Sequence, residues 1–361
     1  MIYNHKLYQE DLVFLAEENL NWDRLRGKNI LVTGATGLIG TFLIDAIMKR
    51  NELYQDAIMV YALSRNKEKL ETKFGHYAED QNLKIMVQDI SKGFDPEGNC
   101  FDYVIHAASN THPNEYSNDP VGTITTNVLG TYHLLEYVRQ KENSRIVLLS
   151  SVEVYGENKG DVTSFGEDYC GYINCNTLRA GYPESKRLSE AMLQAYIGQY
   201  HVDGIAVRLS RTYGPTIEPD DSKAISQFIR KAVYGEDIVL KSDGKQMYSY
   251  CYVADIAGAI LKCMTAGNCG EAYNAADNAS DISLKEIAEY LAGITGRQVV
   301  YELPDENEKR GYSTATKALM DSEKIKKLGW DARYSIKEGL VRTVSILKDA
   351  RRVEVCAMDE R

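Results

Sequence analysis

Residues 29–40 read NILVTGATGLIG, and this stretch decides the fold that we expect. The first five residues are mostly apolar and β-branched, which is typical of a short buried strand. Gly34, Gly37 and Gly40 follow at the spacing GxxGxxG, and a helical pattern begins at Leu38. Such a turn presents the free N–H groups of a helix N-terminus to an anion. We therefore predict a dinucleotide site, where Gly34 turns tightly, Gly37 admits a pyrophosphate and Gly40 lets helix and strand pack closely.

Strands and helices alternate outward from this turn. The expected strands are 29–33, 57–63, 83–87, 103–106 and 145–150, and the expected helices are 38–50, 121–140, 182–200 and a charged stretch from residue 66. This alternation indicates an α/β fold with a Rossmann-type doubly wound parallel sheet. A smaller mixed α/β C-terminal domain is expected to bind substrate over the carboxyl ends of the strands.

The domain boundaries follow from the same pattern. We expect an N-terminal helical extension at 1–26, with an amphipathic helix from Glu10 to Leu25, and a dinucleotide-binding domain at 27–210. Residues 211–350 form mainly the substrate domain, with some segments that return to the sheet, and 351–361 form a tail.

Composition excludes several classes of protein. Of 361 residues, 44% are hydrophobic and 26% are charged, which is normal for a globular protein and excludes a mainly disordered chain. The net charge of -10 argues against nucleic acid as a partner, and no stretch is apolar enough to suggest a membrane span. Seven cysteines without a CxxC pair and no signal-peptide pattern lead us to expect a cytoplasmic protein without a metal.

The end of the second strand bears on the choice of dinucleotide. An acidic residue there would favour NAD by accepting hydrogen bonds from a ribose. The chain has Ser64 and Arg65 instead, and Arg65 either faces the 2′-phosphate of NADP or is a solvated arginine at a helix start. Asp89, after the third strand, is placed to contact adenine or to cap a turn. The expected cofactor is therefore NAD or NADP.

A tyrosine and a lysine at the spacing YxxxK are candidates for proton transfer. The spacing occurs at three pairs: Tyr137/Lys141, Tyr155/Lys159 and Tyr182/Lys186. Of these, Tyr182 opens a helix with Pro183 in its first turn, so Lys186 lies one turn later on the same face. A cation at about 4 Å contributes roughly 4 kcal/mol at an effective dielectric of ~20, or about three pKa units. We therefore expect Lys186 to bring Tyr182 close to half ionised, so that it accepts a proton from a hydroxyl while Ser151 hydrogen-bonds the same oxygen.

Further motifs follow in order between about residues 28 and 340. They are GATGLIG (34–40), HAAS (106–109), TTNVLGT (125–131), SSVEVYG (150–156), YPESK (182–186), RLSRTYGP (208–215), YVADIA (252–257) and KKLGW (326–330). Together these pieces resemble the extended short-chain dehydrogenase/reductase family, in particular its NAD-dependent nucleotide-sugar epimerases and dehydratases. The resemblance implies a Rossmann domain, a C-terminal nucleotide-sugar domain and a homodimer.

The resemblance also implies roles for individual residues. Ser151, Tyr182 and Lys186 correspond to the hydride-transfer triad, and Lys186 also binds nicotinamide ribose. The cofactor side or its support is implied for Gly34, Thr36, Gly37, Leu38, Ile39, Ser64, Arg65, Asp89, Ile90, Ala107, Ala108, Ser109 and Asn127, together with Tyr182 and Lys186.

Glu153 bears on the chemistry that follows oxidation. Dehydratases and decarboxylases of the family often place an acid/base carboxylate at this position, where it removes a proton next to a ketone. In glucose-type 4,6-dehydratases an aspartate commonly precedes it, and here that residue is Val152. Glu153 is therefore a candidate second acid/base, although a plain loop residue is the competing interpretation.

The stretch 167–187 looks most like the decarboxylase branch, which makes UDP-xylose from UDP-glucuronate. Arg179 matches an arginine of that branch, but Tyr248 stands where much of the family has an arginine before YVxD. Conversely, Arg211 stands where the family usually has asparagine. We hypothesise that Arg211 supplies the diphosphate charge lost at residue 248, with a surface or ion-paired arginine as the competing interpretation. Arg310 loosely matches a second substrate-side arginine.

The sequence therefore predicts an enzyme that transiently oxidises a hydroxyl of a nucleotide-diphosphate sugar. Its reaction type is epimerisation or dehydration, with Tyr182 as the base. The alternatives are a UDP-glucuronate decarboxylase-like enzyme, an NADPH-dependent carbonyl reductase and a non-catalytic cofactor-sensing protein on the same fold.

Overall fold

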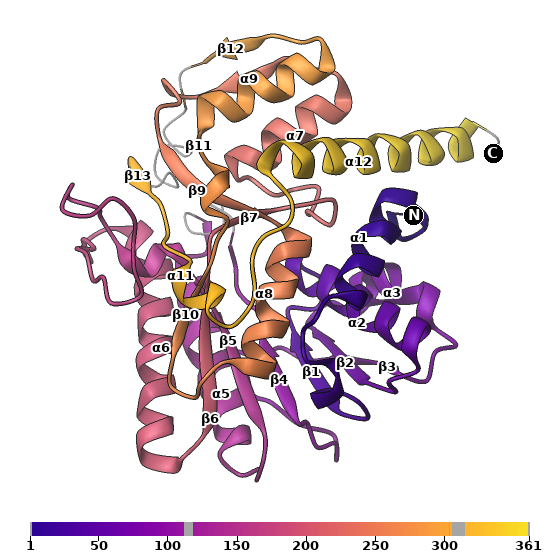
Figure 1. The fold of residues 1–361 in the computed structure, drawn as a ribbon, viewed down its shortest axis with the longest axis vertical. Coiled ribbons are helices and arrows are strands. Elements are labelled where there is room, and N and C mark those ends of the chain that lie inside the picture. The colour runs from indigo at the N-terminus through magenta and orange to yellow at the C-terminus, as the bar shows by residue number, and fades with distance from the viewer. Residues whose placement is uncertain (1, 112–117, 303, 305–314, 360–361) are drawn as a thin grey trace.

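A computed structural model describes residues 2–111, 118–302, 304 and 315–359 of the chain (Figure 1). The central sheet of this described part has seven parallel strands in the order β10-β6-β5-β4-β1-β2-β3. The strands are β1 (Asn29–Thr33), β2 (Met59–Ser64), β3 (Leu83–Val87), β4 (Tyr103–His106), β5 (Arg145–Ser151), β6 (Asp203–Leu209) and β10 (Ala272–Ala275). The order reverses between β1 and β4, which confirms the doubly wound sheet and opens a crevice at the carboxyl ends of these strands.

Helices cover both faces of this sheet because residues of each strand alternate between the faces. On β1, Ile30 and Val32 belong to one hydrophobic cluster and Leu31 to another. The first cluster includes residues of α1 (Lys6–Glu17), α2 (Leu38–Tyr54) and α8 (Val253–Ala266). The second includes residues of α5 (Pro120–Val138) and α6 (Gly181–Tyr200). The remaining crossover contains α3 (Lys67–Phe74), between β2 and β3.

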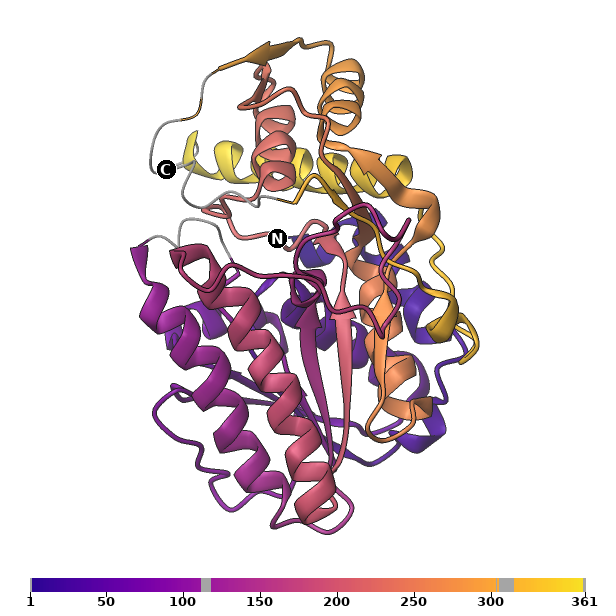
Figure 2. The same ribbon diagram turned by 90° about the vertical axis from the view of Figure 1, so that its left-hand side faces the viewer.

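A second layer stands at the end of the sheet to which the strand arrows point (Figures 1 and 2). Its main sheet is built around β9 (Met247–Tyr252), which pairs with β7 (Arg211–Tyr213), β11 (Asp281–Ser283) and β13 (Lys317–Ala318). The other elements are β8 (Ile238–Leu240), β12 (Val299–Tyr301), α7 (Ala224–Tyr234), α9 (Leu284–Thr295) and α12 (Ile336–Asp359). The short helix α11 (Glu323–Lys326) lies beside β10 of the central sheet. This layer is the expected smaller mixed α/β part, and it returns to the central sheet through β10, which pairs with β6.

The N-terminal helix differs from the prediction of Glu10 to Leu25. The helix α1 spans Lys6–Glu17, where the imidazole of His5 accepts a hydrogen bond from the Leu7 N–H at its start. It ends because Glu18 is extended and Asn21 takes a left-handed conformation with φ of 57°. The apolar residue Trp22 suggested a longer helix, but it packs into the core from a separate short 3₁₀ turn.

Side chains of α1 bind it to the rest of the fold. The Tyr8 hydroxyl donates to Asp45 of α2 at 2.6 Å, and the Tyr252 hydroxyl donates to Asp11 of α1 at 2.7 Å. Arg342 of α12 pairs with Asp11 at 2.8 Å. Within the described residues, no helix combines the length and apolar character needed to cross a membrane.

Candidate active site

A cleft of about 610 Å³ lies between the carboxyl ends of the sheet and the second layer. Almost all of the predicted site residues that the structure describes line it. On the predicted cofactor side these are Gly34, Thr36, Gly37, Leu38, Ile39, Ser64, Arg65, Asp89, Ile90, Ala107, Ala108 and Ser109. On the predicted substrate side they are Ser151, Glu153, Arg179, Tyr182, Lys186, Arg211 and Tyr248.

The glycine turn tolerates no larger residue at two of its positions. Gly34 has φ of 65°, and a Cβ there would lie 2.7 Å from the backbone of Ala107 and Ala108. A Cβ on Gly40 would lie 2.3 Å from the Gly34 carbonyl oxygen. The helix α2 starts at Leu38 after Gly37, which has no side chain to cap the first N–H groups. The turn therefore leaves the positive end of a 17-residue helix directed at the cleft, which suits a pyrophosphate.

The end of β2 offers a hydroxyl and a guanidinium to the cleft. The Ser64 and Thr36 hydroxyls lie 3.2 Å apart, and Arg65 is exposed. Asp89 accepts hydrogen bonds from the Ser91 hydroxyl and N–H, and these bonds lower the pKa of its carboxyl. Asp89 therefore caps its own turn, and one of its oxygens is held at the cleft wall by Ser91.

The predicted proton-transfer residues meet where β5 ends and α6 begins. Ser151 is the last residue of β5 and precedes the short 3₁₀ helix η4 (Val152–Tyr155). Tyr182 and Lys186 lie one turn apart at the start of α6, and both are buried. The Ser151 hydroxyl hydrogen-bonds the phenol of Tyr182. The three side chains thus form one cluster in the wall of the cleft.

The pKa of Tyr182 is displaced in the direction opposite to our expectation. Burial raises it to about 12, the Ser151 hydrogen bond lowers it, and the charge of Glu153 raises it further. The expected cation does not act on the phenol as assumed, because the Lys186 ammonium donates to the Leu149 carbonyl at 2.9 Å. Burial also lowers the pKa of Lys186 to about 8. The expectation of a half-ionised phenol is therefore wrong for the protein alone.

The other two YxxxK pairs are structural. The Tyr137 hydroxyl accepts a hydrogen bond from the Phe101 N–H at 2.9 Å. Tyr155 is fully buried and bonds Asn274, while Lys159 stacks on Tyr172 instead. Neither Tyr137/Lys141 nor Tyr155/Lys159 lines the cleft.

Glu153 is flanked by arginines from two different segments. Its carboxylate lies 2.8 Å from the Arg179 guanidinium and 3.7 Å from that of Arg211. Arg211 also stacks on Tyr248, with its guanidinium carbon 3.7 Å from the ring centroid. The Tyr248 hydroxyl donates to the Ala315 carbonyl at 2.9 Å, which fixes this ring. The cluster places Arg211 beside the candidate acid/base.

Asn127 is the exception among the predicted cofactor residues, because it does not line the cleft. It is buried on α5, where its amide donates to the Ser185 hydroxyl at 2.8 Å. The Ser185 hydroxyl in turn donates to the Tyr182 carbonyl. Asn127 therefore supports the first turn of α6 rather than facing the cleft. The predicted Arg310 lies outside the described residues.

Sequence reasoning missed the far end of the cleft. Lys223 and Lys241 line it from the second layer, with Gln246 and Phe228 nearby. Lys241 closes the short strand IVL at 238–240, and a lysine after such a strand was the available signal. No group of three or more potential metal ligands occurs in the part of the chain that the structure describes.

Comparison with known proteins agrees with this geometry. Residues 30–276 match the sequence model of the NAD dependent epimerase/dehydratase family. UDP-glucuronic acid decarboxylase 6 of Arabidopsis thaliana is 30% identical over 316 residues, which cover 86% of each chain. UDP-glucuronic acid decarboxylase 1 of Xenopus tropicalis is 27% identical over 321 residues, covering 88% of this chain and 71% of that protein.

Solved structures share the fold. The dTDP-glucose 4,6-dehydratase DesIV of Streptomyces venezuelae, crystallised with NAD, is 25% identical. It superposes with a TM-score of 0.76 over 90% of this chain and 98% of that one. The resemblance expected from the motifs is confirmed, as is the fold.

Proposed function

The chain belongs to the NAD dependent epimerase/dehydratase family, and from this premise we propose that it modifies a nucleotide-diphosphate sugar by transient oxidation of a sugar hydroxyl. One observation carries the proposal. Ser151, Tyr182 and Lys186 lie together in the cleft that the glycine turn opens, and Glu153 lies on the same wall. A protein that only sensed the cofactor would need no such cluster.

The residues present fit a bound dinucleotide. Gly34 and Gly40 form a turn that a Cβ would fill, and the open N-terminus of α2 accepts a pyrophosphate. When bound, NAD supplies a positively charged ring that takes up a hydride from the sugar and later returns it. Arg65 at the rim leaves NADP as the competing dinucleotide.

The protein's own residues handle the proton. In our proposal Tyr182 accepts the proton of the sugar hydroxyl, while Ser151 orients the phenol oxygen and the hydroxyl toward each other. With a pKa of about 12 the phenol is protonated near neutral pH, and only the phenolate, formed by loss of that proton to solvent, can accept the sugar proton. Positive charge that enters with the ligands must therefore stabilise the phenolate. In the protein alone the Lys186 ammonium donates to the Leu149 carbonyl, and in our proposal it supports the phenolate only once the ligands are bound.

Glu153 is our proposed second acid/base, and it acts on the carbon next to the oxidised position. The two guanidiniums beside its carboxylate hold it in place at the wall of the cleft. Val152 replaces the aspartate that dehydratases of glucose type commonly have, so elimination of water has no second acid at this place.

Decarboxylation of a UDP-glucuronate-like sugar is the second candidate function. The decarboxylase relatives favour it, and so do Arg179 and Arg211, whose two positive charges against one carboxylate suit an acidic sugar. Our earlier hypothesis placed Arg211 at the diphosphate. Its contact with Glu153 argues instead for the sugar end of the cleft.

We also propose a cytoplasmic homodimer. The six cysteines that the structure describes are free thiols, as in a reducing compartment.

The proposed homodimer rests on the outer faces of α5 and α6, which expose apolar side chains. Of these, Val121 is 69%, Ile124 40% and Leu188 50% accessible. Exposed apolar side chains on neighbouring helices are typical of an interface. Sedimentation as a monomer at micromolar concentration would exclude the dimer.

The decisive experiment incubates the purified protein with a panel of nucleotide sugars and follows product mass and proton exchange. Loss of water, loss of carbon dioxide and an isomer of unchanged mass separate the three reaction types. Steady turnover of added NADPH with a simple carbonyl compound would support the reductase instead. Cofactor binding without any change in a sugar would support the sensor.

A further inference from the structure

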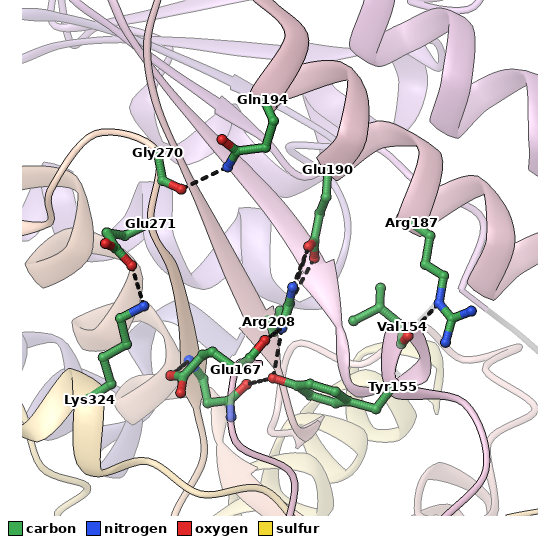
Figure 3. A network of polar contacts seen from close by, with 11 residues as sticks. Val154, Tyr155, Glu167, Arg187, Glu190, Gln194, Arg208, Gly270, Glu271 and Lys324 are labelled. Atoms are coloured by element: carbon green, nitrogen blue, oxygen red, sulfur yellow. Dashed lines mark hydrogen bonds and ion pairs between the residues drawn. The ribbon is translucent and has the colours of Figure 1, made fainter. Parts of the chain in front are cut away.

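One group of charged side chains outside the proton-transfer cluster serves the fold. Arg208 of β6 pairs with Glu190 of α6 at 2.7 Å (Figure 3). Its guanidinium also donates to the Tyr155 hydroxyl at 3.1 Å and to the Glu167 carbonyl at 2.6 Å. Each of the three guanidinium nitrogens therefore has an oxygen partner within the protein. This network joins α6, β6 and the segment after β5.

A different group of charges joins the second layer to the predicted cofactor side of the cleft. Glu218 lies in the segment between β7 and α7, and its carboxylate reaches α3 of the central sheet's outer layer. One of its oxygens lies 2.9 Å from the Lys69 ammonium, and the other lies 3.1 Å from the Lys73 ammonium. The Glu218 side chain is only 13% exposed, so the carboxylate is held between the two lysines.

The segment that carries Glu218 is attached at a second point. The Thr216 hydroxyl donates to the carbonyl of Leu38, the first residue of α2, at 2.7 Å. The segment therefore contacts both the glycine turn that suits a pyrophosphate and the helix that follows β2. Because Thr216 and Glu218 are only two residues apart, these contacts fix the place of the carboxylate at the cofactor side of the cleft.

The end of β2 is where a dinucleotide-binding fold distinguishes NAD from NADP. A carboxylate there accepts a hydrogen bond from the ribose 2′-hydroxyl, whereas an arginine accommodates a 2′-phosphate. In this chain Arg65 directly follows β2, and Lys69 lies in the first turn of α3. Both line the cleft, and so do Glu218 and Asp220. Cations from the central layer and carboxylates from the second layer thus share this corner of the cleft.

We propose that Glu218 is a specificity-determining residue that makes this chain prefer NAD to NADP. The end of β2 has no carboxylate, and the second layer supplies one instead. Glu218 neutralises Lys69, which would otherwise attract a 2′-phosphate, and its own charge repels that phosphate. The inference rests on the proposed function, because it concerns the dinucleotide that the same cleft would hold.

The cations of this corner do not outweigh the carboxylates. Arg65 is exposed and the Lys69 side chain is 50% exposed, so water and salt screen both charges. Glu218 is largely shielded from water, and Asp220 adds a second negative charge from the same segment. The pKa of Lys69 is raised by its hydrogen bond to Glu218 and further by the charge of Asp220, as expected when both carboxylates lie near its ammonium. A phosphate beside Arg65 would therefore meet two carboxylates.

The test measures binding of NAD and NADP by calorimetry to the protein freed of nucleotide. We expect the wild type to bind NAD at least about 10-fold more tightly than NADP. Glu218→Gln keeps the size of the side chain and removes its charge. NADP should then bind about 10-fold more tightly than it binds the wild type, while NAD affinity changes by less than about 3-fold.

Glu236→Gln is the matched control. Glu236 pairs with Lys231 at 3.0 Å in the second layer, and neither residue lines the cleft. This variant removes one carboxylate from a lysine–glutamate pair, as Glu218→Gln does, but at a distance from the cofactor side. Both dinucleotide affinities should equal those of the wild type.

A second variant separates the charge of Glu218 from its attachment to α3. Lys69→Gln combined with Lys73→Gln breaks the same ion pairs but leaves the carboxylate without its cations. NADP affinity should then fall by about 10-fold, which is the direction opposite to that in Glu218→Gln. A bridge that only held the segment in place would change affinity in the same direction in both variants, because both lose the same contacts. Thermal melting shows that each variant is folded, and the lysine variant still tests the proposal if Glu218→Gln is not.

An unchanged NADP affinity in Glu218→Gln would overturn the proposal, and so would a wild type that binds NADP as tightly as NAD. A change in the same direction in the two variants would overturn it as well. None of these measurements needs a sugar. A protein with the expected preference for NAD that converts no nucleotide sugar would contradict the proposed function and leave the role of Glu218 intact.

Discussion

The two sides of the cleft are built by different means. The predicted cofactor side consists mainly of backbone, with Gly34 and Gly40 packed so closely that a Cβ would collide with neighbouring main chain. The predicted sugar side consists of charged side chains, with Glu153 between Arg179 and Arg211. Tyr182 and Lys186 lie where the two sides meet.

The difference teaches where this chain has room to vary. A single added methyl group at Gly34 or Gly40 would disrupt the backbone turn, so these positions require glycine. Charged side chains can be held by contacts between neighbouring strands, as Arg211 on β7 is by the ring of Tyr248 on β9. Substitutions on the first side therefore disturb backbone packing, whereas those on the second change charge and contacts.

The largest expected effect comes from Gly34→Ala on the cofactor side. The new Cβ would lie 2.7 Å from backbone atoms at a φ of 65°. We expect a loss of about 2–3 kcal/mol in the free energy of unfolding and about 100-fold in NAD affinity, measured by thermal melting and calorimetry. Gly75→Ala is the control, because a Cβ there meets nothing within 4 Å. Unchanged NAD affinity in Gly34→Ala would refute the requirement for glycine.

Glu153→Gln tests the sugar side through its chemistry. The amide keeps the shape but cannot accept a proton, so turnover should fall by about 100-fold while nucleotide-sugar affinity changes little. Initial rates and equilibrium binding give the two quantities. Glu157→Gln, which lies outside the cleft lining, serves as the comparison. A turnover equal to that of the wild type would leave Glu153 a structural residue.

Arg211→Ala tests the sugar side through its charge. Loss of one charge-assisted contact should weaken binding of an acidic nucleotide sugar by about 10-fold, and that of a neutral one by less. Titration of both sugars measures this difference. Arg139→Ala, at the residue that follows α5 and pairs with Glu136, is the control. Equal affinities in the variant and the wild type would show that Arg211 contacts no ligand.

Lys186→Met has the smallest expected effect, and it concerns stability. The folded pKa of about 8 lies below the ordinary 10.5, so at pH 7 the buried ammonium costs about 3 kcal/mol. The lost hydrogen bond to Leu149 offsets about 1–2 kcal/mol. The variant should therefore be about 1–2 kcal/mol more stable at pH 7 while losing activity.

The pH dependence of this effect has a defined sign. Between about pH 8 and 10.5 the unfolded wild type binds more protons than the folded protein, so its stability rises with pH. The advantage of Lys186→Met should be complete below pH 8 and disappear as the pH approaches 10.5. Denaturant titrations at several pH values measure it, and an advantage that grows with pH would contradict the assignment.

Local patterns were sufficient to predict five of the seven described strands of the central sheet, the glycine turn and the clustering of Ser151, Tyr182 and Lys186, but not β6 and β10. Each of these features is encoded within a short segment of the sequence. Because the carboxyl ends of parallel strands meet at one edge of the sheet, residues that follow different strands come together there. The choice among three YxxxK pairs came from helix context, which Pro183 marks. The N-terminal helix was predicted to begin and end too late, because its start at Lys6 and the extended residue Glu18 at its end have no strong signal in the sequence.

Effects that depend on three-dimensional surroundings could not be predicted. The pKa of Tyr182 was expected to fall because a cation was assumed to face the phenol, whereas burial dominates and Lys186 bonds a backbone carbonyl. Arg208 appeared only as part of a motif, since its partner Glu190 lies 18 residues away on a different element. The meeting of Glu153 with Arg179 and Arg211 likewise depends on the tertiary fold.

The central claim is tested most directly by comparing the wild type with Tyr182→Phe on the same nucleotide sugars, with product formation followed by mass spectrometry. We predict that the wild type converts at least one of them and that the variant does so at least about 100-fold more slowly with cofactor affinity retained. Equal rates in the two proteins would contradict the account.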